Sequence, residues 1–202
     1  MTARRIGPWV VVAVALAAGG LGVLASLFVA SPGPLLGTEV GQRLYNDALS
    51  AAAPPPPEGV AVARRGDVVP ALDVVDLDAK PLRLPDAYAG RPVLVNLWAS
   101  WCGPCIEEMP ELDRFAREQG ADGVQVLGIA LDDADAVRAF LERVPVGYAI
   151  ALDPPGPADA GVRLGNPRGV LPYTVLIDAD GRLRKHRIGP FAHGETDAWA
   201  SP

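Results

Sequence analysis

The two cysteines of this chain, Cys102 and Cys105, are the only ones in its 202 residues, and two residues separate them. A hydrophobic run at 93–98 precedes the pair, and a pattern typical of a helix follows from Ile106. A Cys-x-x-Cys pair at the junction of a strand and a helix indicates a dithiol that can be oxidised to a disulfide and reduced again. The spacing therefore predicts thiol–disulfide chemistry.

The expected place of Cys102, at the start of a helix, explains why its thiol would react. The first turn of a helix leaves backbone N–H groups unpaired and carries a partial positive charge. We therefore expect the pKa of Cys102 to lie below its ordinary value of about 8.5. Cys105 lies one turn further on and could attack a mixed disulfide formed at Cys102. Pro104 suits a first helical turn, and Gly103 has no side chain to obstruct a substrate.

Two other uses of the cysteine pair fit the sequence less well. A zinc site needs about four ligands, and the chain offers no second cysteine pair. Its only histidines, His186 and His193, lie far along the chain in polar segments. A purely structural disulfide would close so short a loop that it would stabilise the fold little. Redox chemistry is favoured, with the other two readings left open.

The hydrophobic pattern predicts the elements that must position the dithiol. Residues 93–98 are apolar apart from Asn96, which is typical of a central strand buried on both faces. Strands that alternate with helical segments after it predict a parallel α/β arrangement. The other expected strands lie at 72–77, 82–84, 124–130, 148–152, 173–177 and 183–188, and the expected helical segments at 38–53, 86–88, 102–119 and 134–143.

Three stretches resemble one known family. They are Val93–Cys105, which ends in Trp-Cys-Gly-Pro-Cys, then Glu108–Leu112, and finally Gly169–Asp178. Over residues 68–188 the chain is similar to membrane-anchored thioredoxin-like thiol–disulfide oxidoreductases of the TlpA/ResA type. These are related to the cytochrome c maturation thioredoxins and belong to the AhpC/TSA-like superfamily. The resemblance implies a thioredoxin fold, an α/β domain with a central mixed sheet flanked by helices, and a family-type insertion between residues 134 and 164.

The resemblance also implies roles for residues at the dithiol. Cys102 would be the attacking nucleophile and Cys105 the resolving thiol. Pro172 matches the proline that is cis in thioredoxin-like proteins and faces the disulfide. Leu171, the residue before it, would offer backbone hydrogen bonds to a substrate.

The substrate-docking surface would include the residues around the first cysteine. Trp101, Gly103 and Pro104 are expected there together with Leu171. Trp98 could help to shield the dithiol, or it could equally belong to the core.

Glu108 is a candidate for a role in proton transfer. It follows Cys105 by three residues, so both lie near one face of the expected helix. A carboxylate there would raise thiol pKa values and could relay protons, and the resemblance links this position to redox tuning. Asn96 occupies the place of a buried aspartate in thioredoxin, and its amide cannot take up a proton. The alternative for Glu108 is an exposed helix acid, and Glu107 and Glu111 are interpreted as solvated.

The N-terminal part of the chain predicts a membrane segment. Arg4 and Arg5 precede an uncharged stretch at 6–30, which is nearer the length of a transmembrane helix than that of a signal peptide. We expect an anchor at 1–30, with a cleaved signal peptide as the alternative, then a Pro/Ala-rich connector at 31–66 that acts as a tether. The thioredoxin-like domain would occupy 67–202.

This organisation predicts where the domain works and with what. The two arginines would stay in the cytoplasm, so a single-pass protein would expose its domain to the periplasm or an equivalent space. Disulfides persist there, and a reductase in that compartment needs a transmembrane electron donor of the thiol-transfer type. Disulfide-bearing extracytoplasmic proteins would be its substrates. The net charge of −6 argues against nucleic acid.

The expected function is reduction of substrate disulfides, by resemblance in cytochrome c or copper-site maturation. The alternatives are a thiol peroxidase, which shares the fold, and a module that delivers Cu(I) through the dithiol. No metal and no cofactor besides the Cys102–Cys105 disulfide are expected. The family normally ends in a longer amphipathic helix, whereas this chain predicts only one or two turns around Trp199.

Overall fold

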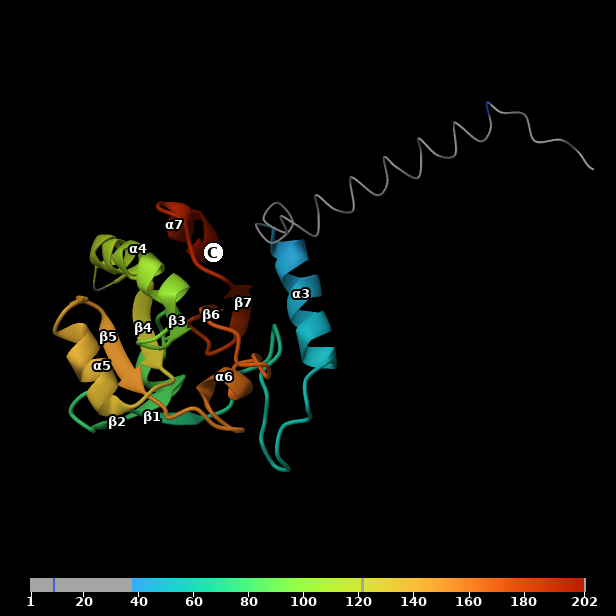
Figure 1. Cartoon of the computed structure of the whole chain (residues 1–202), viewed down its shortest axis with the longest axis horizontal. Coiled ribbons are helices and arrows are strands. Elements are labelled where there is room, and N and C mark those ends of the chain that lie inside the picture. The colour runs from blue at the N-terminus through green and yellow to red at the C-terminus, as the bar shows by residue number, and fades with distance from the viewer. Residues whose placement is uncertain (1–8, 10–37, 121, 202) are drawn as a thin grey trace, which may run out of the picture. The chain divides into compact units, whose positions relative to one another are not determined.

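The hydrophobic strand before the dithiol, β3 (Val93–Trp98), is buried at all six residues and lies inside a mixed sheet. Seven strands, in the part of the chain that the structure describes, form this sheet in the order β2-β1-β5-β4-β3-β6-β7 (Figure 1). β3 pairs in parallel with β4 (Gln125–Ala130) and antiparallel with β6 (Tyr173–Ile177). The remaining strands are β1 (Leu72–Asp76), β2 (Pro81–Leu84), β5 (Ala149–Leu152) and β7 (Leu183–Ile188). The expected central strand and the parallel order β3–β4–β5 are confirmed.

This computed structural model describes residues 9, 38–120 and 122–201, and the chain divides into two compact units, residues 1–42 and 43–202. The membrane segment expected at 1–30 lies outside the described residues, apart from Trp9. None of the helices formed by the described residues combines the length and the apolar character needed to cross a membrane.

In the described part of the chain the helical segments also lie where the sequence predicts them, except for a short segment at 160–163 that is not among the expected helices. They are α3 (Glu39–Ala51), the 3-10 turn η1 (Asp86–Tyr88), α4 (Gly103–Gln119), α5 (Ala134–Leu141), α6 (Ala160–Arg163) and α7 (Glu195–Ala200). The side chain of Asp133 caps α5 by accepting from two backbone N–H groups of its first turn. Residues 134–164, where the insertion is expected, form α5, β5 and α6. The C-terminal helix α7 is as short as the sequence indicates.

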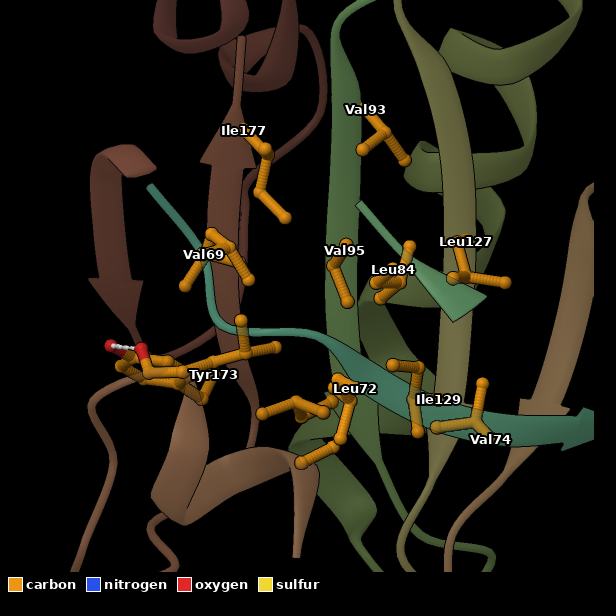
Figure 2. Packing of buried hydrophobic residues seen from close by; sticks show 14 of the residues in the cluster. Val69, Leu72, Val74, Leu84, Val93, Val95, Leu127, Ile129, Tyr173 and Ile177 are labelled. Atoms are coloured by element: carbon orange, nitrogen blue, oxygen red, sulfur yellow. Dashed lines mark hydrogen bonds between the residues drawn. The ribbon is translucent and has the colours of Figure 1, made fainter. Parts of the chain in front are cut away.

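Each face of the sheet carries its own hydrophobic cluster, because alternate residues of a strand point to opposite sides. On one face, Val93 and Val95 of β3 pack with residues of β1, β2, β4 and β6 (Figure 2). Tyr173 belongs to this cluster, and its hydroxyl donates a 3.1 Å hydrogen bond to the carbonyl of Leu164. On the other face, Leu94 of β3 packs under α4, α5 and α7 in a cluster that also contains both cysteines. The dithiol is therefore built on this second face.

The part of the expected tether that falls in the second unit packs on the domain instead. Leu49 of α3 contacts the cluster around Tyr173, and Asn46 donates from Nδ2 to the carbonyl of Gly165 over 3.4 Å. Beyond the proline run, the backbone N–H of Ala63 donates to the carbonyl of Arg163 at 2.8 Å. Leu49 is the reason for the difference, since the weak apolar stripe of this helix finds hydrophobic surface to cover.

Candidate active site

The two cysteines form a disulfide at the start of α4. Cys102 is the N-cap residue, with extended backbone, and its Sγ lies 2.02 Å from that of Cys105. The unpaired N–H groups and the positive end of the helix dipole therefore lie at this sulfur pair. Cys102 is 6% exposed and Cys105 is 1% exposed, so the first sulfur is the more accessible to a partner. Pro104 occupies the first turn, where its missing N–H leaves no bond unmade.

The surface around Cys102 is open and partly apolar. Trp101 is 72% exposed, and Gly103 and Pro104 beside it are exposed as well. A Cβ placed on Gly103 would meet no atom within 4 Å, so nothing of the described chain crowds this side of the disulfide. Trp98, by contrast, is fully buried and packs against Phe140, with ring centroids 5.4 Å apart. Of the two tryptophans near the dithiol in the sequence, Trp101 is exposed and Trp98 belongs to the core.

The loop that leads into the disulfide is held by one carboxylate. Asp132, just after β4, accepts hydrogen bonds at Oδ2 from the backbone N–H of Ser100 at 2.9 Å and from its hydroxyl at 2.6 Å. These bonds lower the pKa of Asp132 even though burial opposes its ionisation. Since β4 lies beside β3, this carboxylate fixes the approach of the chain to Trp101 and Cys102.

The peptide bond between Leu171 and Pro172 is cis, as the resemblance implies. Pro172 is buried, and its carbonyl accepts from the backbone N–H of Gly189 at 3.0 Å. Leu171 is half-buried and packs against both clusters, including the one that contains the two cysteines. The structure thus brings Leu171 to the dithiol side of the sheet. A second cis bond, between Leu84 and Pro85, was not expected.

Glu108 lies one helical turn beyond Cys105 and is almost completely buried, with 1% of its surface exposed. Its Oε1 accepts from Nδ2 of Asn96 at 2.8 Å, and its Oε2 accepts from the backbone N–H of Phe191 at 2.9 Å. Burial raises the pKa of Glu108 to about 7, although the bonds from Phe191 and Asn96 and the charge of Arg187 favour the ionised form. The alternative of an exposed helix acid is therefore wrong.

Two further side chains surround this carboxylate. Asn96 on β3 also donates from Nδ2 to the hydroxyl of Thr174 at 3.0 Å, on the strand paired with it. Tyr148 is buried, and the nearby negative charge of Glu108 adds to the effect of burial in raising its pKa. Sequence reasoning singled out Asn96 but missed Tyr148. Only the packing of the segment before β5 against α4 brings this tyrosine near Glu108.

Glu111 was interpreted as solvated, and this is wrong, because only 5% of its side chain is exposed. Its Oε1 lies 2.7 Å from Nη2 of Arg114, and Oε2 lies 3.2 Å from Nδ1 of His193. Burial opposes ionisation, but the bonds from Arg114 and from Thr196 hold the pKa of Glu111 at about 2. Its neighbour Glu107 is exposed, as expected. The difference arises because the C-terminal segment covers one side of α4.

The described part of the chain contains no cluster of three or more His, Cys, Asp or Glu side chains arranged to hold a metal ion.

A family model and individual known proteins match this chain. Residues 64–200 match the Redoxin family. The thiol-disulfide oxidoreductase ResA of Bacillus thuringiensis (strain Al Hakam) is 32% identical over 127 residues, an alignment that covers 61% of this chain and 69% of that protein.

Solved structures of other proteins have a similar fold. A protein of Chlorobium tepidum assigned as a thiol:disulfide interchange protein DsbE is 28% identical with a TM-score of 0.55, covering 64% of this chain and 88% of its own. The exposed lipoprotein thioredoxin of Streptococcus pneumoniae is 25% identical with a TM-score of 0.54, and the match covers 65% of this chain and 98% of that one. The fold is thioredoxin-like, as the resemblance implies.

Proposed function

This chain belongs to the Redoxin family and is a thiol–disulfide oxidoreductase, and we propose that it reduces disulfides in extracytoplasmic proteins. One observation carries the proposal. The Cys102–Cys105 disulfide lies at the positive end of α4, with exposed Trp101 beside it and buried Glu108 one turn behind it. The groups that the reaction needs thus lie close together around the start of α4. They are a docking surface at Trp101, an accessible sulfur at Cys102, a resolving sulfur at Cys105 and a proton acceptor at Glu108.

The exchange proceeds in two displacements. In the reduced enzyme, the thiolate of Cys102 attacks one sulfur of the substrate disulfide, which forms a mixed disulfide and releases the other substrate sulfur as a thiolate. Cys105 then loses its proton and attacks the sulfur of Cys102. The Cys102–Cys105 disulfide forms, and the second substrate sulfur leaves. Two electrons pass from the dithiol to the substrate, and the oxidised enzyme is the state seen in this structure.

Glu108 takes the proton that Cys105 must lose. A general base works best when its pKa is close to the working pH, and that of Glu108 is raised to about 7. Asn96 contacts the carboxylate but cannot hold the proton itself, so its part is to orient Oε1. When Glu108 is ionised it also disfavours a second negative charge nearby, which links thiolate formation at the dithiol to the protonation of this residue.

Substrate docking uses the exposed surface around the disulfide. Trp101 offers a large aromatic side chain, and Gly103 leaves the approach to the sulfurs open. Leu171, before the cis proline, contributes backbone groups to an extended segment of the substrate. Pro104 forms the edge of this exposed surface.

The proposed location rests on the N-terminal sequence and is supported by the name of one structural neighbour. Residues 6–30 contain no charge, and one structural neighbour is named an exposed lipoprotein. In a periplasmic or equivalent space the reduced dithiol has to be regenerated, so we assign this task to a transmembrane donor of the thiol-transfer type. Apocytochrome c and copper-site proteins are the substrates to test first.

Trapping of substrate tests the order of the two cysteines. Cys105→Ser should accumulate mixed disulfides through Cys102, because the second displacement cannot occur. Cys102→Ser should abolish reduction of insulin disulfides and trap nothing. Turnover retained in Cys102→Ser would overturn the assignment of the nucleophile. A faster reaction with hydroperoxide than with disulfides would instead make the chain a peroxidase.

A further inference from the structure

The connection between β7 and α7 reaches the buried carboxylate behind the dithiol. Phe191, in the middle of this connection, is 5% exposed and donates its backbone N–H to Oε2 of Glu108 at 2.9 Å. Its ring lies edge-on to Trp199 of α7, with centroids 5.2 Å apart. A loop amide can stabilise the ionised form of a carboxylate only if the loop is held in place. The contacts that hold Phe191 therefore affect Glu108.

Arg187 contacts this loop from the end of β7. Its guanidinium carbon lies 4.5 Å from the centre of the Phe191 ring, and its Nη2 donates to the carbonyl of Pro190 at 2.9 Å. The side chain is only 11% exposed, so these contacts are made largely out of water, where a cation over an aromatic ring is most favourable. Arg187 therefore restrains Phe191 through its ring and through the residue that precedes it.

Glu195, at the start of α7, fixes Arg187 in turn. Its two carboxylate oxygens accept from Nη1 and Nη2 of Arg187 at 2.8 and 2.9 Å, which is the paired geometry that an arginine fork provides. The same carboxylate accepts from the backbone N–H of Ala192 at 3.0 Å. The Arg187–Glu195 pair thus holds the loop on both sides of Phe191.

We propose that Arg187 is a positioning residue: it holds the Phe191 amide against the Glu108 carboxylate and so sets when that carboxylate takes up and releases a proton. Glu195 serves by keeping the guanidinium in this orientation. The inference rests on the proposed role of Glu108 in the exchange reaction and extends it to a pair of residues that do not touch the dithiol.

The charges that face Glu108 support this assignment. Arg187 on β7 favours the carboxylate, as do the N–H of Phe191 and the amide of Asn96, while burial opposes it. Tyr148 faces Glu108 from the segment before β5. On α4 itself, Cys105 lies one turn before Glu108 and is bonded to Cys102 in this structure. Loss of the loop restraint would remove a hydrogen bond to the ionised form, so the carboxyl group would hold its proton to higher pH.

The test follows the amide of Phe191 by NMR across a pH titration of the full-length, oxidised protein. In the wild type its chemical shift should change with a midpoint near pH 7, the value for Glu108. Arg187→Lys keeps the charge but loses the planar fork. The double variant Arg187→Gln/Glu195→Gln removes both charges together, which avoids leaving a buried carboxylate without its partner.

Both variants should raise the midpoint of the Phe191 amide titration. In the double variant the rise should be about one pH unit, which is a tenfold change in the proton affinity of Glu108. The pH at which disulfide exchange is half-maximal should move with it. Arg184→Gln is the matched control, because Arg184 lies exposed on the same strand, where it pairs with Asp178, and the substitution should change neither quantity. A midpoint that stays at the wild-type value in both variants would overturn the proposal, as would a shift in the double variant alone, since charge without positioning would explain it.

The exchange rate separates this inference from the function on which it rests. If Glu108→Gln leaves the pH dependence of exchange unchanged, Glu108 is not the base, and the proposed function fails at that step whatever the NMR titration shows. If Glu108→Gln alters the rate profile but the Arg187 variants leave the NMR midpoint and the pH of half-maximal exchange at their wild-type values, Arg187 does not position the carboxylate and the inference fails alone.

Discussion

The backbone N–H of Phe191 donates a 2.9 Å hydrogen bond to Oε2 of Glu108, although 83 residues separate the two in the chain. This bond joins the C-terminal segment to the helix that carries the dithiol. Because Oε1 of the same carboxylate is bound by Asn96 of β3, the group that titrates behind the disulfide is held by two distant parts of the domain. The pH behaviour of the enzyme is therefore expected to depend on tertiary packing.

Glu108 should make the domain less stable as the pH rises. Its pKa is raised to about 7 when folded, against an ordinary value of 4.5, so between these values the folded state binds more protons than the unfolded one. The free energy of unfolding should fall by up to about 3 kcal/mol from pH 4.5 through pH 7, and Glu108→Gln should lose this slope. Urea unfolding at several pH values measures how the free energy of unfolding changes with pH. Exposed Glu107→Gln is the control and should keep the wild-type slope.

Glu108→Gln should also slow the step in which Cys105 resolves the mixed disulfide. A glutamine cannot accept the proton of that thiol, and general bases commonly contribute about a hundredfold or more, so we expect at least a tenfold loss at pH 7. The deficit should shrink at high pH, where Cys105 can ionise without help. Stopped-flow measurement of mixed-disulfide decay gives the rate directly. Equal rates for Glu108→Gln and wild type at pH 7 would return this residue to a purely structural role.

Trp101→Ala should separate docking from stability. The side chain is 72% exposed, so its removal should change the free energy of unfolding by no more than about 0.5 kcal/mol. An exposed tryptophan beside the reacting sulfur is an anchor for a protein partner, and its loss should lower kcat/KM for protein disulfides about tenfold. A small disulfide reagent should react almost as before. Buried Trp98→Ala is the contrast and should cost about 3–5 kcal/mol of stability.

Glu111 should contribute stability that acid removes. Its folded pKa of about 2 lies below the ordinary 4.5, so the unfolded state binds more protons between these values. The contribution, about 3 kcal/mol at most, is complete above pH 5 and is lost as the pH falls toward 2. Glu111→Gln should therefore be destabilised at pH 7 and approach the wild type near pH 2. A constant difference between the two proteins over that range would contradict the assigned pKa.

The elements around the dithiol could be predicted because their signals are local. Six hydrophobic or amide-bearing residues at 93–98 indicate a buried strand, and Cys-Gly-Pro-Cys indicates the start of a helix. The cis bond before Pro172 followed from a flanking sequence that resembles a known family. Each of these inferences depends on residues within a few positions of one another.

The environment of the carboxylates could not be predicted, because it depends on residues far along the chain. Glu111 resembles any surface acid until His193 and Thr196 fold over α4. The spacing of Glu108 from Cys105 indicates a shared helix face, but it does not show that Phe191 completes the site. Arg187 lies in a polar strand that suggests nothing more than an edge of the sheet.

The reduction potential of the Cys102–Cys105 pair in the full-length protein tests the central claim most directly. Equilibration with glutathione or dithiothreitol buffers, followed by thiol counting, measures it. A reductase should have a potential near that of thioredoxin, about −270 mV. A potential near about −120 mV would mark a strong oxidant and would contradict the proposed direction of electron flow.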